Sequence, residues 1–168
     1  MNQLKFEILR IHAGWFDVRF YTQDKGCCIG ASDAWDNDSP KYFLQMLVDL
    51  LEGKTQVGYV VFDEEPGTYI VCIERGTVNR LTVSYSKLDN HEWEEIEVHG
   101  NLSYKELEKF VKIEEVFMIV EEFDLRSFGQ SVVAAFEKYM PKHDRDKYRG
   151  NWMVFPEEEL EKLKACLM

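Results

Sequence analysis

Three apolar runs between residues 56 and 88 constrain the fold of this chain more than any other feature. They cover residues 56–62, 68–74 and 80–88 and are rich in β-branched and aromatic residues, which suit a pleated surface. The connectors contain Pro66-Gly67 and Gly76, residue types that tight turns require. The pattern predicts a three-stranded meander, and the apolarity of its first two runs on both faces indicates central strands.

An alternating pattern precedes the meander. Residues 4–11 and residues 15–22 each alternate between an apolar face and a mixed face, and Gly14 ends the turn that joins them. This pattern predicts an amphipathic hairpin with one face in the core. Residues 27–30 allow one further short strand.

A helix is predicted over residues 40–52. Ser39 can accept an otherwise unpaired backbone N–H, and Pro40 at the first helical position needs no donor. Apolar residues then recur at helical spacing until Gly53, a residue type that commonly ends helices. We expect this helix to cover one face of the sheet.

Three further segments carry helix signals. Ser103 and Glu106 have the spacing of a capping box, which predicts a helix through residue 111 and onward. Residues 127–140 carry an apolar stripe that ends before a proline. A last helix follows Pro156, with acidic residues against its positive end.

Three segments complete the pattern between these elements. Residues 92–99 predict a fourth strand of the meander, and residues 142–150 are polar and predict a link. Residues 116–120 are five consecutive apolar residues, which fit either a buried strand or a buried helical turn.

Together these elements predict one α+β domain over residues 1–168. Its antiparallel sheet combines the meander with the N-terminal hairpin and is packed by about three to four helices. A chain of 168 residues with 45% hydrophobic content can bury an ordinary core for one domain.

The charge balance narrows the choice of partner. The chain has 31 acidic and 20 basic residues, a formal net charge of -11, which opposes binding to nucleic acid or to an anionic membrane. We therefore expect a basic protein partner, no nucleic acid and no membrane, and a chain that is a monomer or a weak homodimer. The apolar runs are too short to cross a membrane, and four dispersed or vicinal cysteines fit free thiols in a reducing cytoplasm.

Catalytic and metal-binding motifs are missing from the sequence. It contains no Gly-rich phosphate loop, no metallopeptidase helix, no Gly-x-Ser-x-Gly elbow and no paired Cys-x-x-Cys motif. We therefore predict no catalytic residue, no cofactor and no metal ligand. A thiol such as Cys27 paired with a histidine such as His12 remains a weaker alternative, because free cysteines are usually inert packing residues.

Two clusters resemble metal ligands without completing a site. Asp33, Asp36 and Asp38 lack the glycine and the terminal bidentate glutamate of a calcium loop, and a solvated loop that caps a helix explains them better. His91 and His99 flank an acidic run but have no evident third ligand, so surface histidines are the simpler interpretation.

Acidic residues gather between residues 89 and 124. This segment contains twelve acidic residues and three lysines, so it carries nine of the eleven net negative charges. Such a run is usually a solvated face, but clustered carboxylates can also steer and hold a cationic protein. The candidate partner-binding residues are Glu92, Trp93, Glu94, Glu95, Glu97, Glu106, Glu108, Glu114 and Glu115.

Aromatic residues with a charged rim would sharpen such a face into an interface. The candidate anchors are Trp15, Tyr21, Trp35, Trp93 and Trp152, and for each of them half-burial in a small core explains the residue equally well.

The chain is small, acidic and cysteine-poor, with the aromatic strand Gly14-Trp15-Phe16-Asp17-Val18-Arg19-Phe20 and a hairpin around Glu65-Pro66-Gly67. In these features and in its predicted α+β class, it resembles the immunity proteins of bacterial polymorphic-toxin and contact-dependent inhibition systems. The resemblance implies a protein that neutralises a toxin, often a basic nuclease, by covering its active site with acidic residues. It assigns no individual residue of this chain.

Three functions therefore remain open on the sequence alone. The first is an acidic inhibitor of a basic partner. The second is a small enzyme or ligand binder with a cleft between the sheet and residues 40–52, near His12 or Cys27. The third is a structural or regulatory homodimer joined through the hairpin of residues 4–22.

Overall fold

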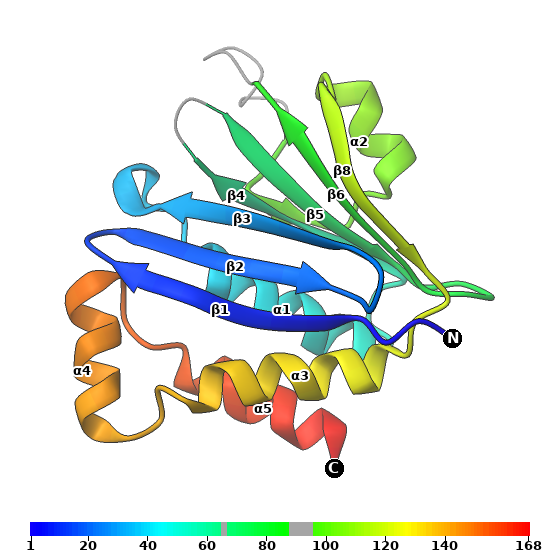
Figure 1. Ribbon diagram of the computed structural model, residues 1–168. Coiled ribbons are helices and arrows are strands. Elements are labelled where there is room, and N and C mark those ends of the chain that lie inside the picture. Colours follow the sequence, from blue (N-terminus) through cyan, green and yellow to red (C-terminus); the bar gives the residue numbers. More distant parts are fainter. Residues whose placement is uncertain (65–66, 88–95) are drawn as a thin grey trace.

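The computed structural model describes residues 1–64, 67–87 and 96–168 (Figure 1). Within these ranges the chain is α+β, with two antiparallel sheets and five α-helices. The strands are β1 (Lys5–His12), β2 (Trp15–Tyr21), β3 (Gly26–Ser32), β4 (Val57–Asp63), β5 (Thr68–Glu74), β6 (Arg80–Ser86), β7 (His99–Gly100) and β8 (Glu115–Glu121). The helices are α1 (Ser39–Leu51), α2 (Tyr104–Phe110), α3 (Leu125–Glu137), α4 (Lys142–Asn151) and α5 (Glu157–Leu167), and a short 3-10 helix covers Asp33–Trp35.

The small sheet has the strand order β1-β2-β3 and confirms the predicted hairpin. Ala13 and Gly14 join its first two strands, and both have positive φ angles of 50° and 83°. This two-residue turn matches the twist of the strands, and glycine adopts it without strain. A Cβ atom on Gly14 would lie 2.5 Å from the Asp33 carboxylate, so the turn has no room for a larger residue.

The large sheet has the strand order β7-β4-β5-β6-β8. Strands β4, β5 and β6 form the predicted meander, and the ambiguous residues 116–120 belong to β8, which pairs with β6. The fourth meander strand was predicted over residues 92–99, of which residues 96–98 are not in a strand. Residues 92–95 lie outside the described ranges, and His99–Gly100 pairs with β4 at the opposite edge from β6.

Two hydrophobic clusters hold these layers together. In the larger cluster, side chains of the small sheet and of the inner face of the large sheet meet α1, α3 and α5, which lie together in Figure 1. Phe43 of α1 is central to it: its ring centroid is within 6.4 Å of those of Phe6, Phe20, Phe62 and Phe128. The smaller cluster lies between the outer face of the large sheet and α2.

The helix boundaries follow from local hydrogen bonds. Asp38, rather than Ser39, caps α1, because its side chain accepts the Lys41 N–H, whereas the buried Ser39 hydroxyl donates to the Val61 carbonyl. Gly53, with a φ of 73°, follows the end of α1 as predicted. The capping box of Ser103 and Glu106 is present at the start of α2, which ends at Phe110. Asp124 caps α3, which begins at Leu125, two residues before the predicted start.

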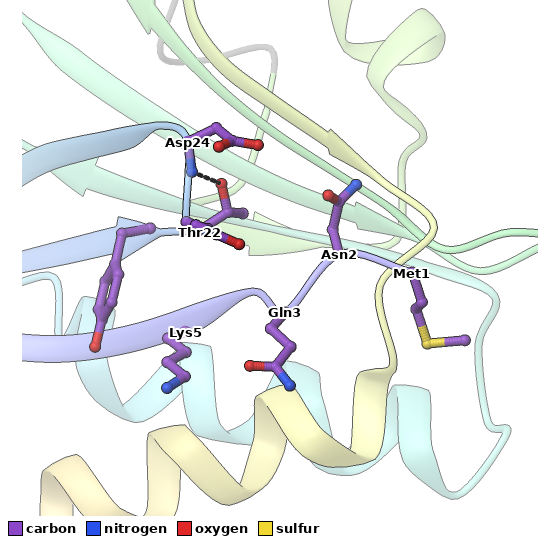
Figure 2. A pocket seen from close by; sticks show the side chains of 8 residues that line it. Met1, Asn2, Gln3, Lys5, Thr22 and Asp24 are labelled. Atoms are coloured by element: carbon purple, nitrogen blue, oxygen red, sulfur yellow. Dashed lines mark hydrogen bonds between the residues drawn. The ribbon is translucent and has the colours of Figure 1, made fainter.

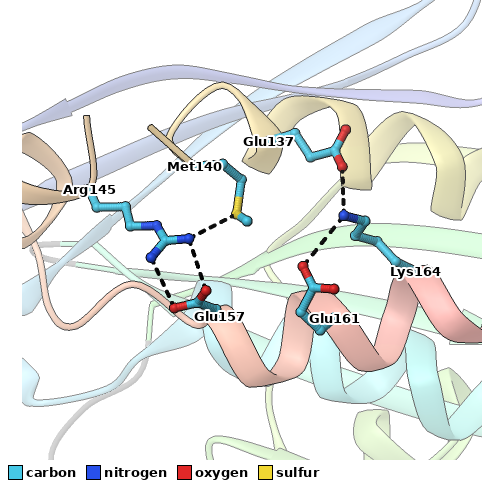
Figure 3. Close-up of polar contacts among 6 residues, drawn as sticks. All are labelled: Glu137, Met140, Arg145, Glu157, Glu161 and Lys164. Carbon is cyan, nitrogen blue, oxygen red and sulfur yellow. Dashed lines mark hydrogen bonds and ion pairs between the residues drawn. The ribbon is translucent and has the colours of Figure 1, made fainter. Parts of the chain in front are cut away.

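Residues 142–150, predicted as a polar link, belong to the helix α4. Its sequence shows no apolar stripe, because Tyr148 is the only fully buried side chain among those described for this helix. The Tyr148 ring packs edge-on against Phe16, Tyr139 and Phe155, which fixes the helix through one aromatic residue. Arg145 then donates to both carboxylate oxygens of Glu157 at 2.9 and 3.1 Å, joining α4 to the start of α5 (Figure 3).

Candidate functional site

The described candidate partner-binding residues all carry exposed side chains. They are Glu97, Glu106, Glu108, Glu114 and Glu115. The other four candidates, Glu92, Trp93, Glu94 and Glu95, lie outside the described residues. The five exposed carboxylates come from the segment that covers the outer face of the large sheet and from the start of β8, which follows it.

Helix α2 carries two of these carboxylates, Glu106 and Glu108. Leu107 is fully buried against Tyr59, Val61, Ile70 and Cys72 of the sheet. Because Glu106 and Glu108 flank Leu107 on the helix, they lie on its exposed sides. Lys105 and Lys109 are exposed on the same helix, so its surface carries both signs of charge.

The remaining acids lie at the two edges of the sheet. The Tyr59 hydroxyl donates to the Glu97 carbonyl at 2.9 Å, which holds Glu97 beside β4. Glu114 donates its backbone N–H to the Tyr85 carbonyl of β6 at 2.9 Å, and Glu115 begins β8. Since two strands separate β4 from β8, these edges are about 14 Å apart at the usual strand spacing. The described acids therefore do not form one compact cluster, and Glu115, the cross-strand partner of Tyr85, leaves the sheet on the face opposite α2.

Several of these carboxylates already have a local role. Glu106 accepts the Ser103 N–H in the capping box, and this hydrogen bond holds its pKa below the usual range. Glu114 lies 3.5 Å from the Lys112 ammonium. Among the residues that the structure describes, Glu97, Glu108 and Glu115 make no ion pair. These three candidate carboxylates therefore have neither an ion pair nor a helix cap to give up when a cationic partner binds.

Three aromatic side chains lie beside the acidic edge at β8. Tyr69 of β5, Tyr85 of β6 and Phe117 of β8 are in mutual contact, with ring centroids 5.4, 5.6 and 6.2 Å apart. We call these three residues the aromatic corner. Burial, followed by the nearby Glu64 carboxylate, raises the pKa of the Tyr69 hydroxyl to about 12, so it remains a neutral donor.

Sequence reasoning did not select the aromatic corner. The anchor residues predicted from the sequence were mostly tryptophans. Of these candidates, Trp152 is buried and its indole N–H donates to the Asp38 carboxylate at 3.1 Å, while Trp15 and Tyr21 are half-buried. Tyr69 and Tyr85 are aromatic residues in adjacent strands of the meander, and this pairing is the signal that could have identified them.

The thiol and imidazole named in the enzyme alternative lie far apart. His12 pairs with Trp15 at one end of β2, whereas Cys27 pairs with Phe20, five residues further along that strand. Five residues of strand span about 17 Å. Burial, followed by the neighbouring Cys28, raises the pKa of the Cys27 thiol to about 11, which keeps it protonated near neutral pH.

The space between α1 and the sheet is filled rather than hollow. The side chains of α1 that face the sheet, among them Phe43, Leu44, Leu47 and Leu50, are fully buried. The cleft that the enzyme alternative placed beside residues 40–52 is therefore occupied by the core.

One edge of the hairpin proposed for homodimer contact is partly covered. Helix α3 packs along β1, and the Phe6 N–H donates to the Ser131 hydroxyl of α3 at 3.1 Å. This contact removes one of the unpaired backbone groups that strand pairing would use.

The three aspartates that follow β3, considered above as metal ligands, each have a different local role. Asp38 caps α1, Asp33 lies over Gly14, and Asp36 adopts a left-handed conformation with a φ of 55°. Across residues 1–64, 67–87 and 96–168, no group of three potential ligands converges on a metal position.

An open hollow of about 530 Å³ lies around the N-terminal segment (Figure 2). It is lined by Met1, Asn2, Gln3, Lys5, Tyr21, Thr22, Gln23 and Asp24. Its polar side chains are three amides, two hydroxyls, one ammonium and one carboxylate, and none of the candidate partner-binding residues lines it. The hollow therefore lies apart from the candidate partner-binding residues.

In the described part of the chain, no helix has the length and apolar character required to span a membrane. Comparison with family models, with curated proteins and with solved structures finds no match for the chain.

Proposed function

We propose that this chain is a noncatalytic binding protein that neutralises a basic protein partner. The simplest form of this function is an immunity protein that blocks a toxin such as a nuclease. The observation that carries the proposal is that three carboxylates of the acidic segment, Glu97, Glu108 and Glu115, are exposed and make no ion pair among the described residues. They belong to the most acidic segment of a protein with a net charge of -11.

Long-range attraction would bring the two proteins together. An excess of negative charge raises the association rate of a cationic surface and disfavours anionic competitors. Once bound, the carboxylates would occupy positions at which a nuclease otherwise holds phosphate groups. Inhibition would then result from occlusion of the active site and would need no chemical step on either protein.

The experiment starts from the genes beside the one that encodes this chain. Each neighbouring toxin domain with a basic sequence is expressed with and without the chain, and bacterial growth is measured. Purified chain is then added to the toxin, and the toxin's activity is measured, for example as cleavage of DNA or RNA. We expect growth rescue together with stoichiometric inhibition.

A charge-matched pair of variants makes this test specific. The first replaces Glu97, Glu108 and Glu115 by Gln and should weaken the inhibition. The control replaces Asp24, Glu122 and Asp146, three exposed acids that are not among the candidate partner-binding residues, by their amides and removes the same net charge. Equal inhibition by the wild type and both triple variants would contradict the proposal, as would growth that no neighbouring toxin domain impairs.

A further inference from the structure

The first half of β8 exposes apolar side chains on both faces of the sheet. Val116 is 40% exposed and Phe117 is 43% exposed, whereas Met118 and Val120 further along the strand are buried. Val116 shares a face with its cross-strand partner Ser84, on the side that α2 covers. Phe117 lies on the other side, with the aromatic corner. This end of the strand is therefore an apolar projection accessible from two directions.

The second half of β8 is covered along its outer edge. The Lys25 ammonium donates to the Ile119 carbonyl, and the Asn2 side chain donates to the Glu121 carbonyl at 2.7 Å. Among the described residues, no segment outside the large sheet donates a hydrogen bond to Val116 or Phe117. The exposed apolar side chains thus coincide with the uncovered part of the edge.

The aromatic corner is fixed in place by the backbone around it. A Cβ atom on Gly67 would lie 2.1 Å from the Tyr85 hydroxyl, so the Tyr85 ring covers this glycine closely. Phe117 is the extra residue of a β-bulge, because Val116 pairs with Ser84 and Met118 with Val83. Bulges commonly re-aim a side chain at an edge. The three rings are therefore positioned before any partner arrives.

The carboxylates near the aromatic corner favour a cationic ligand. Glu115 is the cross-strand partner of Tyr85, so its side chain leaves the sheet on the same face as the ring. Glu64 lies beside the Tyr69 hydroxyl. Aromatic faces attract cations through their quadrupole, and the planar guanidinium group of arginine stacks on them better than an ammonium group does.

We propose that the basic partner is anchored at the open half of β8, where one of its arginine side chains stacks on the aromatic corner and pairs with Glu115. This inference rests on the proposed function and specifies where the partner binds. A second copy of the chain is a poor occupant, because two molecules of net charge -11 would bring Glu114 and Glu115 of each edge together.

The test uses capped hexa-arginine and hexalysine peptides as probes, with the full chain labelled for NMR. Chemical-shift changes are mapped during each titration, and Kd is measured for the wild type and for four variants. Phe117→Ala and Glu115→Gln alter the proposed anchor. Val78→Ala, at a side chain that is 46% exposed, and Glu122→Gln, just beyond the covered end of β8, are their matched controls.

We expect hexa-arginine to bind more tightly than hexalysine and to shift signals of Tyr85, Glu115 and Phe117 most strongly. Phe117→Ala and Glu115→Gln should each weaken the affinity for hexa-arginine about two- to fivefold, and the controls should leave it unchanged. Gly67→Ala, which must displace the Tyr85 ring, should weaken it as well and replaces Phe117→Ala if that variant does not fold.

Different results would overturn different parts of the account. Shifts centred on Glu106 and Glu108 of α2, with full affinity in Phe117→Ala, would reject the anchor while leaving the proposed function in place. Binding of hexa-arginine no tighter than that of an uncharged peptide would reject both. Dimerisation of the chain that Phe117→Ala abolishes would assign the corner to self-association and reject the anchor.

Discussion

The ring of Phe117 stands at 86° to the ring of Tyr85, with 6.2 Å between the two centroids. The contact joins the bulged residue of an edge strand to a regular position of its neighbour. Such an edge-to-face pair is favourable but modest in energy, and Phe117 remains 43% exposed. The residue therefore contributes more exposed surface than core packing.

Substitution of Phe43 and of Phe117 by alanine should have different effects on stability, because only Phe43 is in the core. Phe43→Ala should lower the free energy of unfolding by about 3–5 kcal/mol, because a fully buried ring between both sheets is lost. Phe117→Ala should lower it by about 1 kcal/mol or less, as is usual for a side chain with little burial. Urea unfolding followed by circular dichroism measures both values, and equal losses would mean that Phe117 belongs to the core.

Alanine substitution at two glycines, Gly53 and Gly150, should change the stability of the protein in opposite directions. Nothing lies within 4 Å of a Cβ atom on either Gly53 or Gly150, so packing does not distinguish them. Gly53 has a φ of 73°, and alanine there should cost about 1–2 kcal/mol. Gly150 lies within α4, where alanine should stabilise by up to about 1 kcal/mol. Thermal unfolding of both variants provides the comparison, and a lower Tm for Gly150→Ala would contradict the assignment of α4.

The cap of α3 should make stability depend on pH. Asp124 accepts the Ser127 N–H at 2.6 Å, and this hydrogen bond lowers its pKa from 3.8. A lowered folded-state pKa means that the cap contributes fully above 3.8 and is lost as the pH falls through the lowered value. At neutral pH, Asp124→Ala should cost about 1 kcal/mol.

Substitution of Asp124 by asparagine distinguishes the effect of the cap from the effect of the carboxylate charge. Asp124→Asn should keep most of the stability but lose this part of the pH dependence, because asparagine caps helices without titrating in this range. Urea unfolding between neutral and acidic pH tests the point. A constant difference between wild type and Asp124→Ala at every pH would show that the carboxylate charge is irrelevant.

Arg145 should control the local stability of α4. Its two terminal nitrogens bind the two oxygens of Glu157, a geometry that lysine cannot reproduce (Figure 3). Arg145→Lys should increase amide hydrogen exchange in α4 about two- to fivefold, the range expected of a partly exposed ion pair. Lys147→Arg on the same helix is the control. Unchanged exchange in Arg145→Lys would place the stability of α4 in the Tyr148 contacts alone.

The fold was largely predictable because its signals are local. Alternation defined β1 and β2, two-sided apolarity defined β4 and β5, and the Ser103 capping box defined the start of α2. Helix α4 was missed because its stability depends on Tyr148 entering a distant aromatic cluster, which no local pattern encodes. The same reason left residues 116–120 ambiguous until pairing with β6 assigned them to a strand.

The candidate site was less predictable than the fold. Composition identified the acidic segment, but only the sheet order shows that Glu97 and Glu115 lie at opposite edges. The aromatic corner depends on a bulge and on the register of three strands, and it brings together residues 16 and 32 positions apart in sequence. Spacing along the chain cannot reveal such contacts.

If exposed carboxylates of this chain hold a cationic protein, as we propose, the binding must depend on salt, and this dependence is the most direct test. Kd for the toxin domain identified by growth rescue is measured from about 50 mM to about 500 mM NaCl, a range in which screening of exposed charges changes strongly. We predict that the affinity of the wild type falls steeply with salt and that the variant with Gln at positions 97, 108 and 115 shows a weaker affinity and a flatter slope. An affinity that is independent of salt, and equal in the wild type and this variant, would contradict the account.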